Sequence, residues 1–338
     1  MKFFILFTSF FILSLFGLEQ SSFSPKMKIA FLSSPHVIGK YSQSSYDVAL
    51  ATLLASGDSF ELTKYDIPNE SYETISITLE KIIHEGNMAI LAPLTLEGAQ
   101  NLINIPTTLT VFIPTVHKRD IGPTGNNIIF GSIDYESQVK ALVPYMAESV
   151  AIFYGDSLVG SVLNKMTQSI ASESNKKINN FSSYSVDIKG SNIVKHLARP
   201  AAFSKKSVVT HLPIVKTSML LSHMTFTSVH EKNILSTQIN YDPELLLLTQ
   251  FPDRKNMIIA NSIIEQVPSI YEANALMNND LTFDWINYTT SVGTDYLIAQ
   301  LYGHSRSYSM PLIDHQIIYP VELIRPKESG FEPYNSKR

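Results

Sequence analysis

The chain has 338 residues, of which 44% are hydrophobic and 17% are charged, so it can bury a sizeable core and is not an intrinsically disordered protein. Its 26 Lys and Arg residues against 30 Asp and Glu residues give a formal net charge of −4, which argues against nucleic-acid binding. Cysteine is absent, which excludes disulfides, thiolate nucleophiles, Cys-ligated metal centres and a lipidated cysteine.

The N-terminus has the pattern of a secretory signal peptide. Lys2 precedes an apolar stretch at 3–16, and Gly17 supplies a small residue for cleavage. The stretch is shorter than the roughly 20 residues that cross a bilayer, which favours a cleaved leader at 1–17 over the alternative, an uncleaved N-terminal anchor. No later segment has 18 consecutive apolar residues. We therefore expect a periplasmic protein with no membrane span after cleavage.

From Lys28 onward, short apolar runs alternate with amphipathic stretches, which is typical of parallel β-α-β units. The first part of the chain predicts strands at 29–32, 60–67, 88–92, 109–113 and 128–133. It predicts helices at 44–55, 71–84 and 95–103, the second of which is closed by Gly86.

The same alternation restarts near Asp134, and the length of the chain is itself about twice the roughly 150 residues of one domain. Predicted strands follow at 150–154, 184–188, 207–211, 234–239, 257–260 and 316–323. Predicted helices follow at 136–147, 159–171, 192–197, 214–226, 244–249, 271–277 and 291–302. This order predicts an α/β protein of two doubly wound, three-layer lobes, each with a central parallel sheet.

No motif for catalysis or metal binding is complete. Ser157 lies in a segment that resembles a nucleophile elbow, but Gly160 falls one position too late for the G-x-S-x-G spacing. The nine histidines never occur as H-x-x-x-H or H-E-x-x-H. Segment 122–127 lacks the spacing of a phosphate-binding loop and is interpreted as a turn. We therefore expect a protein that is not an enzyme and uses no metal or cofactor.

Polar side chains follow several of the predicted strands. They are Ser33 and Ser34 after the first strand, Thr95 and Thr115 in lobe one, and Tyr154, Asp156 and Ser157 in lobe two. In open α/β sheets ligands bind beyond the carboxyl ends of the strands, and hydroxyls at helix starts suit a small anion. These seven residues are the predicted ligand site, and helix capping without ligand contact is the alternative.

The order of elements from Lys28 to Arg325 resembles the type I periplasmic binding protein fold of the leucine/isoleucine/valine-binding proteins. The resemblance rests on the segments 28–32, 89–95, 150–160 and 319–323. It implies a cleft between lobe one, at 28–133 with a return segment at 281–303, and lobe two, at 134–265 with a C-terminal strand at 312–325. A tail would occupy 326–338, and the chain would cross between the lobes at 132–135, 266–280 and 303–311.

A narrower resemblance is to the C-terminal domain of the lipoprotein activators of penicillin-binding proteins, which have a stretch similar to 93–98. Two functions stay open on these grounds. The first is non-enzymatic capture of a small polar ligand, amino-acid-like or another carboxylate, for transport or sensing with a membrane permease or sensor. Ser34 and Thr95 would hold a carboxylate, Tyr154 would cover the ligand, and Asp156 would face a cation. The second is a protein-interaction module of the cell envelope with a vestigial cleft.

Overall fold

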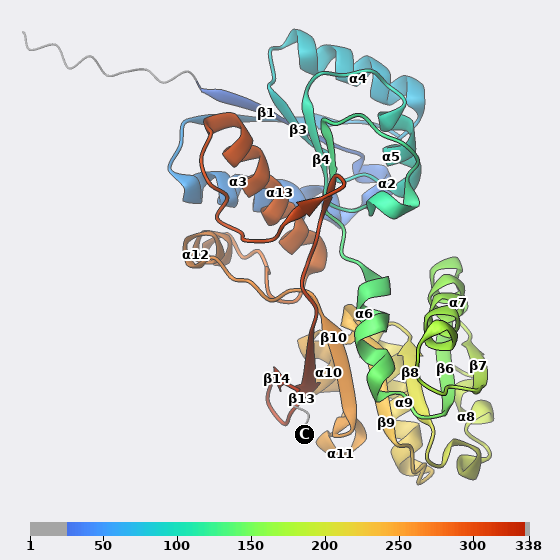
Figure 1. Ribbon diagram of the computed structural model, residues 1–338. Helices are drawn as coiled ribbons and strands as arrows, with labels where there is room; N and C mark the ends of the chain where they lie inside the picture. Colours follow the sequence, from blue (N-terminus) through green and yellow to red (C-terminus); the bar gives the residue numbers. More distant parts are fainter. Residues whose placement is uncertain (1–25, 335–338) are drawn as a thin grey trace, which may run out of the picture.

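Two seven-stranded sheets, each covered by helices on both faces, form the two lobes seen in Figure 1. This computed structural model describes residues 26–334, so the expected leader at 1–17 lies outside the described residues. Both lobes have three layers, and the predicted α/β architecture is confirmed. None of the helices between residues 26 and 334 combines the length and the apolarity of a membrane span.

The sheet of lobe one has the strand order β11-β12-β5-β4-β3-β1-β2. Its strands are β1 (Met27–Ser33), β2 (Phe60–Asp66), β3 (Ala89–Leu91), β4 (Thr110–Ile113), β5 (Ile128–Phe130), β11 (Leu312–Ile313) and β12 (Gln316–Ile317). Its helices are α2 (Pro35–Ile38), α3 (Lys40–Ser56), α4 (Tyr72–His84), α5 (Leu96–Ile103), α12 (Pro268–Leu276) and α13 (Trp285–Tyr302), with a 3-10 turn η1 (Lys118–Asp120). Strands β1 to β5 and β12 are parallel, and β11 is antiparallel to β12.

Alternate residues of β1 fill two separate cores, one on each face of the sheet. Ile29 and Phe31 pack on the side of α3, α12 and α13, whereas Ala30 and Leu32 pack on the side of α4 and α5. Helix α13 is buried on all sides from residue 286 to 299 and packs against α3. Gly293 permits this position, because a Cβ atom there would lie 2.3 Å from the ring of Phe112.

The sheet of lobe two has the order β14-β13-β10-β9-β8-β6-β7. Its strands are β6 (Ser149–Gly155), β7 (Asn180–Val186), β8 (Ser207–His211), β9 (Asn233–Thr237), β10 (Met257–Asn261), β13 (Glu322–Pro326) and β14 (Phe331–Pro333). Its helices are α6 (Tyr135–Leu142), α7 (Leu158–Glu173), α8 (Ile193–His196), α9 (Ile214–Phe226), α10 (Pro243–Leu248) and α11 (Phe251–Arg254), with 3-10 turns η2 (Val143–Tyr145), η3 (Pro200–Phe203) and η4 (Gln238–Asn240). Strands β6 to β10 are parallel, and β13 and β14 add antiparallel pairs at one edge.

The first connection between the lobes lies where the sequence predicts it, near 132–135, whereas the second and the third lie at other points. Within the described residues the chain passes between the two sheets at 131–134, 262–267 and 318–321. Helix α12 packs on α3 of lobe one, so the second crossing lies before it rather than at 266–280. The third crossing lies after β12 rather than at 303–311.

The predicted lobe-two strand at 312–325 is wrong in its first part, at 312–317, whereas its last part, from Glu322, does lie in lobe two. Gln316 pairs with Phe130 in lobe one, whereas Glu322 pairs with Asn261 in lobe two. Pro320 lies between the two strands and lacks the N–H group that a continuous strand would need there. The predicted tail at 326–338 is also corrected, because β14 pairs with β13.

Candidate functional site

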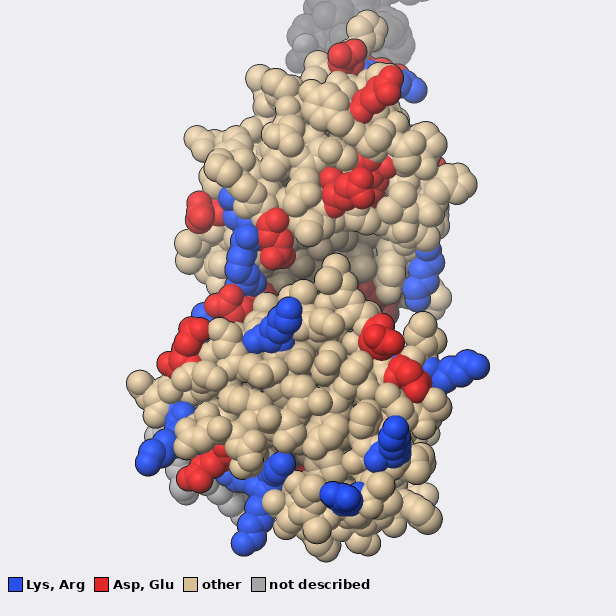
Figure 2. Space-filling model, turned by 90° about the vertical axis from the view of Figure 1, so that its right-hand side faces the viewer, with Lys and Arg blue, Asp and Glu red and all other residues tan. Residues whose placement is uncertain are grey.

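A cavity of about 500 Å³ lies between the two lobes, and Figure 2 shows the surface hollowed between the upper and the lower lobe. Its lining residues are Lys40, Tyr41, Tyr135, Gln238, Ile239, Tyr241, Asp242, Pro243, Glu244, Leu247, Asp280, Phe283, Asp284 and Trp285. They lie at the start of α3 after β1 and α2, at the start of α6 after β5, in the segment from η4 to α10 after β9, and at 280–285, which ends on the first residue of α13. The cavity therefore lies beyond the carboxyl ends of parallel strands, where open α/β sheets bind ligands.

The start of α3 forms one part of the lobe-one wall. Gly39 separates α2 from α3 with a φ of 58°, a conformation that glycine adopts without strain. Helix α3 then begins at Lys40, whose ammonium group lies 5.3 Å from the centre of the Tyr41 ring. This is the distance of a cation–π contact.

The segment before α13 forms the second part of the lobe-one wall. The carboxylate of Asp284 accepts hydrogen bonds from the N–H groups of Ile286 (3.0 Å) and Asn287 (3.1 Å), so it caps α13. Burial raises the pKa of Asp284 above its ordinary value although these hydrogen bonds act in the opposite direction. Asp280 is oriented by the N–H groups of Thr282 (2.7 Å) and Phe283 (3.0 Å). Backbone donors therefore hold both carboxylates in place.

The segment from η4 to α10 forms the lobe-two wall. Gln238 is held by the side chain of Gln138, which donates to its Oε1 atom at 2.7 Å and accepts from its N–H group at 3.0 Å. The N–H group of Ser262, at the second crossing, donates to the same Oε1 atom at 3.1 Å. Asp242 caps α10 by accepting from the N–H group of Glu244 at 2.7 Å. The wall of the cavity is thus tied directly to a segment that connects the lobes.

Aromatic rings from both lobes meet at the cavity. The ring centres of Tyr241 and Phe283 are 4.9 Å apart, and Tyr241 lies at the same distance from Phe331 of β14. Burial, with a smaller contribution from the charge of Asp280, raises the pKa of Tyr241. Burial raises the pKa of Tyr135 to about 12. Both phenols are therefore neutral hydrogen-bonding groups near pH 7.

The charges around the cavity are unbalanced. Asp242 and Glu244 of lobe two and Asp280 and Asp284 of lobe one share the lining with a single basic residue, Lys40. Between residues 26 and 334, no ion pair includes any of these five side chains. Nor does that part of the chain contain three His, Asp or Glu side chains grouped to hold a metal ion.

Comparisons with solved structures identify the fold, although no family model and no curated protein matches the sequence. A branched chain amino acid ABC transporter periplasmic ligand-binding protein from Burkholderia xenovorans superposes with a TM-score of 0.68 and 12% identity, covering 92% of this chain and 95% of that protein. A leucine binding protein, LivK, from Thermotoga maritima gives 0.63 and 12%, covering 91% and 98%. The C-domain of LpoA from Haemophilus influenzae, a regulator of PBP1A, gives 0.61 and 7%, covering 91% and 100%.

This chain has the type I periplasmic binding protein fold. Both resemblances drawn from the sequence, to amino-acid-binding proteins and to the penicillin-binding-protein activators, are confirmed at the level of the fold. The identities of 7 to 12% carry the comparison no further than the fold.

Most of the predicted site residues in lobe one form hydrogen bonds within that lobe. Ser33 and Ser34 are buried, and Ser33 shares a hydrogen bond of 2.8 Å with Ser42. Ser34 leaves its Oγ atom without a partner in the described part of the chain. Thr95 caps α5 and donates through its N–H group and its hydroxyl to the buried carboxylate of Glu70. Thr115 donates its hydroxyl to the carbonyl oxygen of Leu94.

The predicted lobe-two residues lie at the end of β6 and the start of α7. Ser157 caps α7 by accepting from the N–H group of Gly160 at 3.1 Å. Tyr154 is half-buried and Asp156 is exposed. None of the seven predicted residues belongs to the lining of the interlobe cavity described above. Ligand contact by these residues stays a prediction.

Most of the cavity residues were missed because they lie several residues beyond the strands or at the start of a helix, and Gln238 and Ile239 because the predicted strand at 234–239 included them. A signal was present in the sequence at 240–244 and 280–285, where aromatic and acidic residues alternate closely. The second stretch also contains Trp285, the single tryptophan of the chain.

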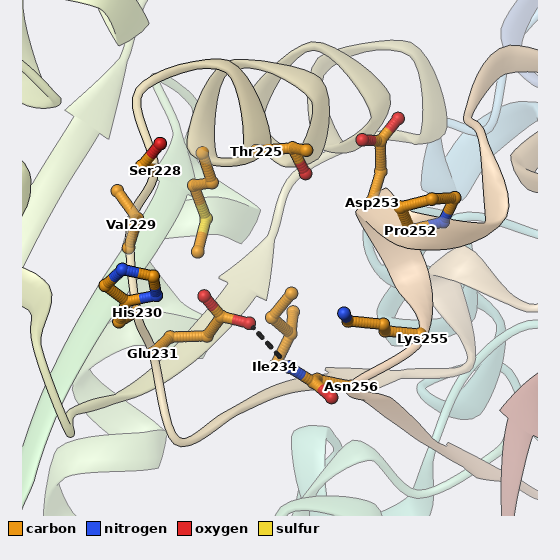
Figure 3. Close-up of a pocket in the computed structure, with 11 residues that line it drawn as sticks. Thr225, Ser228, Val229, His230, Glu231, Ile234, Pro252, Asp253, Lys255 and Asn256 are labelled. Atoms are coloured by element: carbon orange, nitrogen blue, oxygen red, sulfur yellow. Dashed lines mark hydrogen bonds between the residues drawn. The ribbon is translucent and has the colours of Figure 1, made fainter.

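A second cavity, of about 310 Å³, lies in lobe two at the opposite ends of the strands (Figure 3). It is lined by the end of α9 and by the residues that precede β9 and β10, among them His230, Glu231 and Lys255. Asn256 donates to Glu231 across it at 3.1 Å. Because it lies at the amino ends of β9 and β10, it is not where this sheet architecture places a ligand.

Proposed function

We propose that this protein captures a small polar ligand between its two lobes, without chemical conversion, in the periplasm. The observation that carries the proposal is the interlobe cavity of about 500 Å³, built by segments of both lobes at the carboxyl ends of β1, β5 and β9. Its volume lies within the roughly 300 to 1,000 Å³ typical of small-molecule sites. A ligand that contacts both lobes favours a closed arrangement, and the three connecting segments provide the hinge.

The solved structures with this fold support the proposal by analogy. Two of them are described as a leucine binding protein and a branched chain amino acid transporter ligand-binding protein. In this proposal the loaded protein delivers its ligand to a membrane permease or reports it to a membrane sensor. Tyr154 and Asp156, which are half-buried and exposed, would meet the ligand or the opposite lobe only after closure.

The alternative is a regulatory module of the cell envelope, and the observation in its favour is the likeness to the LpoA C-domain. The shared stretch at 93–98 carries less weight, because Thr95 within it caps α5 and binds Glu70. A regulatory module with a vestigial cleft would bind an envelope protein but would not be stabilised by small molecules.

A thermal-shift panel of amino acids, amines, sugars and short peptides tests the proposal. A ligand present at 100 times its Kd adds about 2.7 kcal/mol to the free energy of unfolding. We expect at least one compound to raise the Tm of the wild-type protein, and the shift to vanish in Tyr241→Ala. As a control, Lys255→Ala in the second cavity should keep the shift. A panel without any shift would overturn ligand capture and favour the regulatory module.

A further inference from the structure

Resting on the proposed function, we propose that the ligand is an organic cation, held through a protonated amine between carboxylates of the two lobes and the aromatic rings of the cavity. The shared chemistry is the alkylammonium group. Two sources supply it: amines without a carboxylate, such as putrescine and spermidine, and basic amino acids such as lysine.

The first support is the distribution of charge. Asp280 on lobe one and Asp242 and Glu244 on lobe two line the same cavity. Their charges repel one another across the cleft and oppose closure. A cation between them removes that repulsion and adds charge-assisted hydrogen bonds to both lobes. A simple carboxylate ligand would instead meet these charges with only Lys40 in its favour.

The second support is the aromatic lining. Tyr41, Tyr135 and Trp285 line the cavity together with the carboxylates, and ring faces attract ammonium groups within about 6 Å of their centres. The cavity already contains one such contact, between Lys40 and Tyr41 at 5.3 Å. An alkylammonium ligand can therefore bury its carbon chain against the rings while its charge faces the carboxylates.

A metal ion suits the cavity less well than an organic cation. The described residues place no three His, Asp or Glu side chains together as ligands. The carboxylates of Asp242, Asp280 and Asp284 are already oriented by backbone N–H groups at the start of a helix or turn. These carboxylates therefore line the wall of the cavity and do not converge on a single metal position.

Trp285 provides a specific readout, because it lines the cavity and is the single tryptophan of the chain. Putrescine, spermidine, L-lysine, L-leucine and L-glutamate are titrated while the Trp285 emission is recorded, and each Kd is confirmed by calorimetry. We expect a saturable change with at least one cationic compound. Asp242→Asn and Asp280→Asn should weaken the binding of this compound about tenfold or more, because asparagine can still accept the backbone hydrogen bonds but lacks the charge.

The matched control is Glu272→Gln, which removes a charge from an exposed position on α12 and should leave the Kd unchanged. Lys40→Met distinguishes the two sources, since it should weaken lysine binding but not putrescine binding. A saturable response to leucine or glutamate that matches or exceeds the response to the cations would overturn this inference and leave ligand capture intact. Cation binding that is unchanged in Asp242→Asn and Asp280→Asn would also overturn it. No response to any of the five compounds, together with no thermal shift in the wider panel, would overturn both proposals.

Discussion

The ring of Tyr241 in lobe two lies 4.9 Å, centre to centre, from the ring of Phe283 in lobe one. Phe331 of β14 completes a cluster of three rings, at 4.9 Å from Tyr241 and 6.0 Å from Phe283. Tyr241 also packs against the cores of both lobes. Tyr241 and Phe283 therefore contribute both to the contact between the lobes and to the wall of the cavity.

Removing the central ring of this cluster should destabilise the protein. Tyr241→Ala should lower the free energy of unfolding by about 1 to 3 kcal/mol, less than the roughly 3 to 5 kcal/mol of a fully buried aromatic residue, because Tyr241 is half-buried. Tyr241→Phe keeps the ring contacts and should lose less than about 1 kcal/mol. Urea unfolding of both variants measures the difference. Equal stability of Tyr241→Ala and the wild type would contradict the role of this ring.

His211 should make the protein sensitive to acid. It is 2% exposed, shares a hydrogen bond of 2.7 Å with Thr167 through Nε2, and has its pKa lowered by burial from 6.5 to about 4. The unfolded chain then binds a proton more readily than the folded chain between these two values. The contribution of His211 to the free energy of unfolding is thus fully present above pH 6.5, and about 3 kcal/mol of it is lost as the pH drops towards 4. His211→Gln should remove this part of the pH dependence, whereas His84→Gln at an exposed position should retain it.

Glu70 should change the pH dependence of stability in the opposite direction to His211. Burial raises its pKa above the ordinary value of 4.5, although hydrogen bonds from Thr95 lower it. A carboxyl group whose pKa is raised on folding stabilises the protein most below its unfolded pKa and loses that contribution as the pH rises through the folded pKa. Glu70→Gln should therefore gain stability relative to the wild type between pH 4 and pH 7, as measured by urea unfolding. A difference that stays constant with pH would contradict the raised pKa.

Helix α13 depends on a glycine at its contact with the sheet. A Cβ atom at Gly293 would lie 2.3 Å from Phe112, so Gly293→Ala should cost roughly 1 to 3 kcal/mol through overpacking. Gly122 has open space around it, and Gly122→Ala should change the free energy of unfolding by no more than about 0.5 kcal/mol. Calorimetry on both variants checks the prediction. Equal melting temperatures for the two variants would show that Phe112 moves aside at little cost.

Local patterns predicted the fold because burial on both faces of parallel strands leaves a clear signal. The apolar run at 29–32 lies within β1, and the predicted strand at 207–211 has the same bounds as β8. The start of α13 was missed by six residues, since the cap at Asp284 precedes a first turn without a clear apolar stripe. The split between β12 and β13 was missed because strand partners are set by contacts distant in the sequence.

The site was less predictable than the fold. Strand ends and hydroxyls are visible in the sequence, but Thr95 and Ser157 use their side chains to cap helices. The cavity instead joins Tyr241 and Phe283, which are far apart in the chain and meet only when the lobes assemble. The aromatic and acidic residues at 240–244 and 280–285 are visible in the sequence, but no local pattern shows that these two stretches meet.

Ligand-induced closure is the central claim, and the absence of cysteine allows a direct measurement of it. Val37 on α2 and Leu158 on α7 are 46% and 82% exposed and follow the carboxyl ends of β1 and β6, one in each lobe. Spin labels on Val37→Cys and Leu158→Cys report the interlobe distance by pulsed electron spin resonance. Labels on Leu158→Cys and Ile188→Cys, both in lobe two, provide the control. A saturating ligand should shorten the interlobe distance and leave the control distance unchanged. An interlobe distance that stays the same with a ligand bound in the cavity would contradict the account.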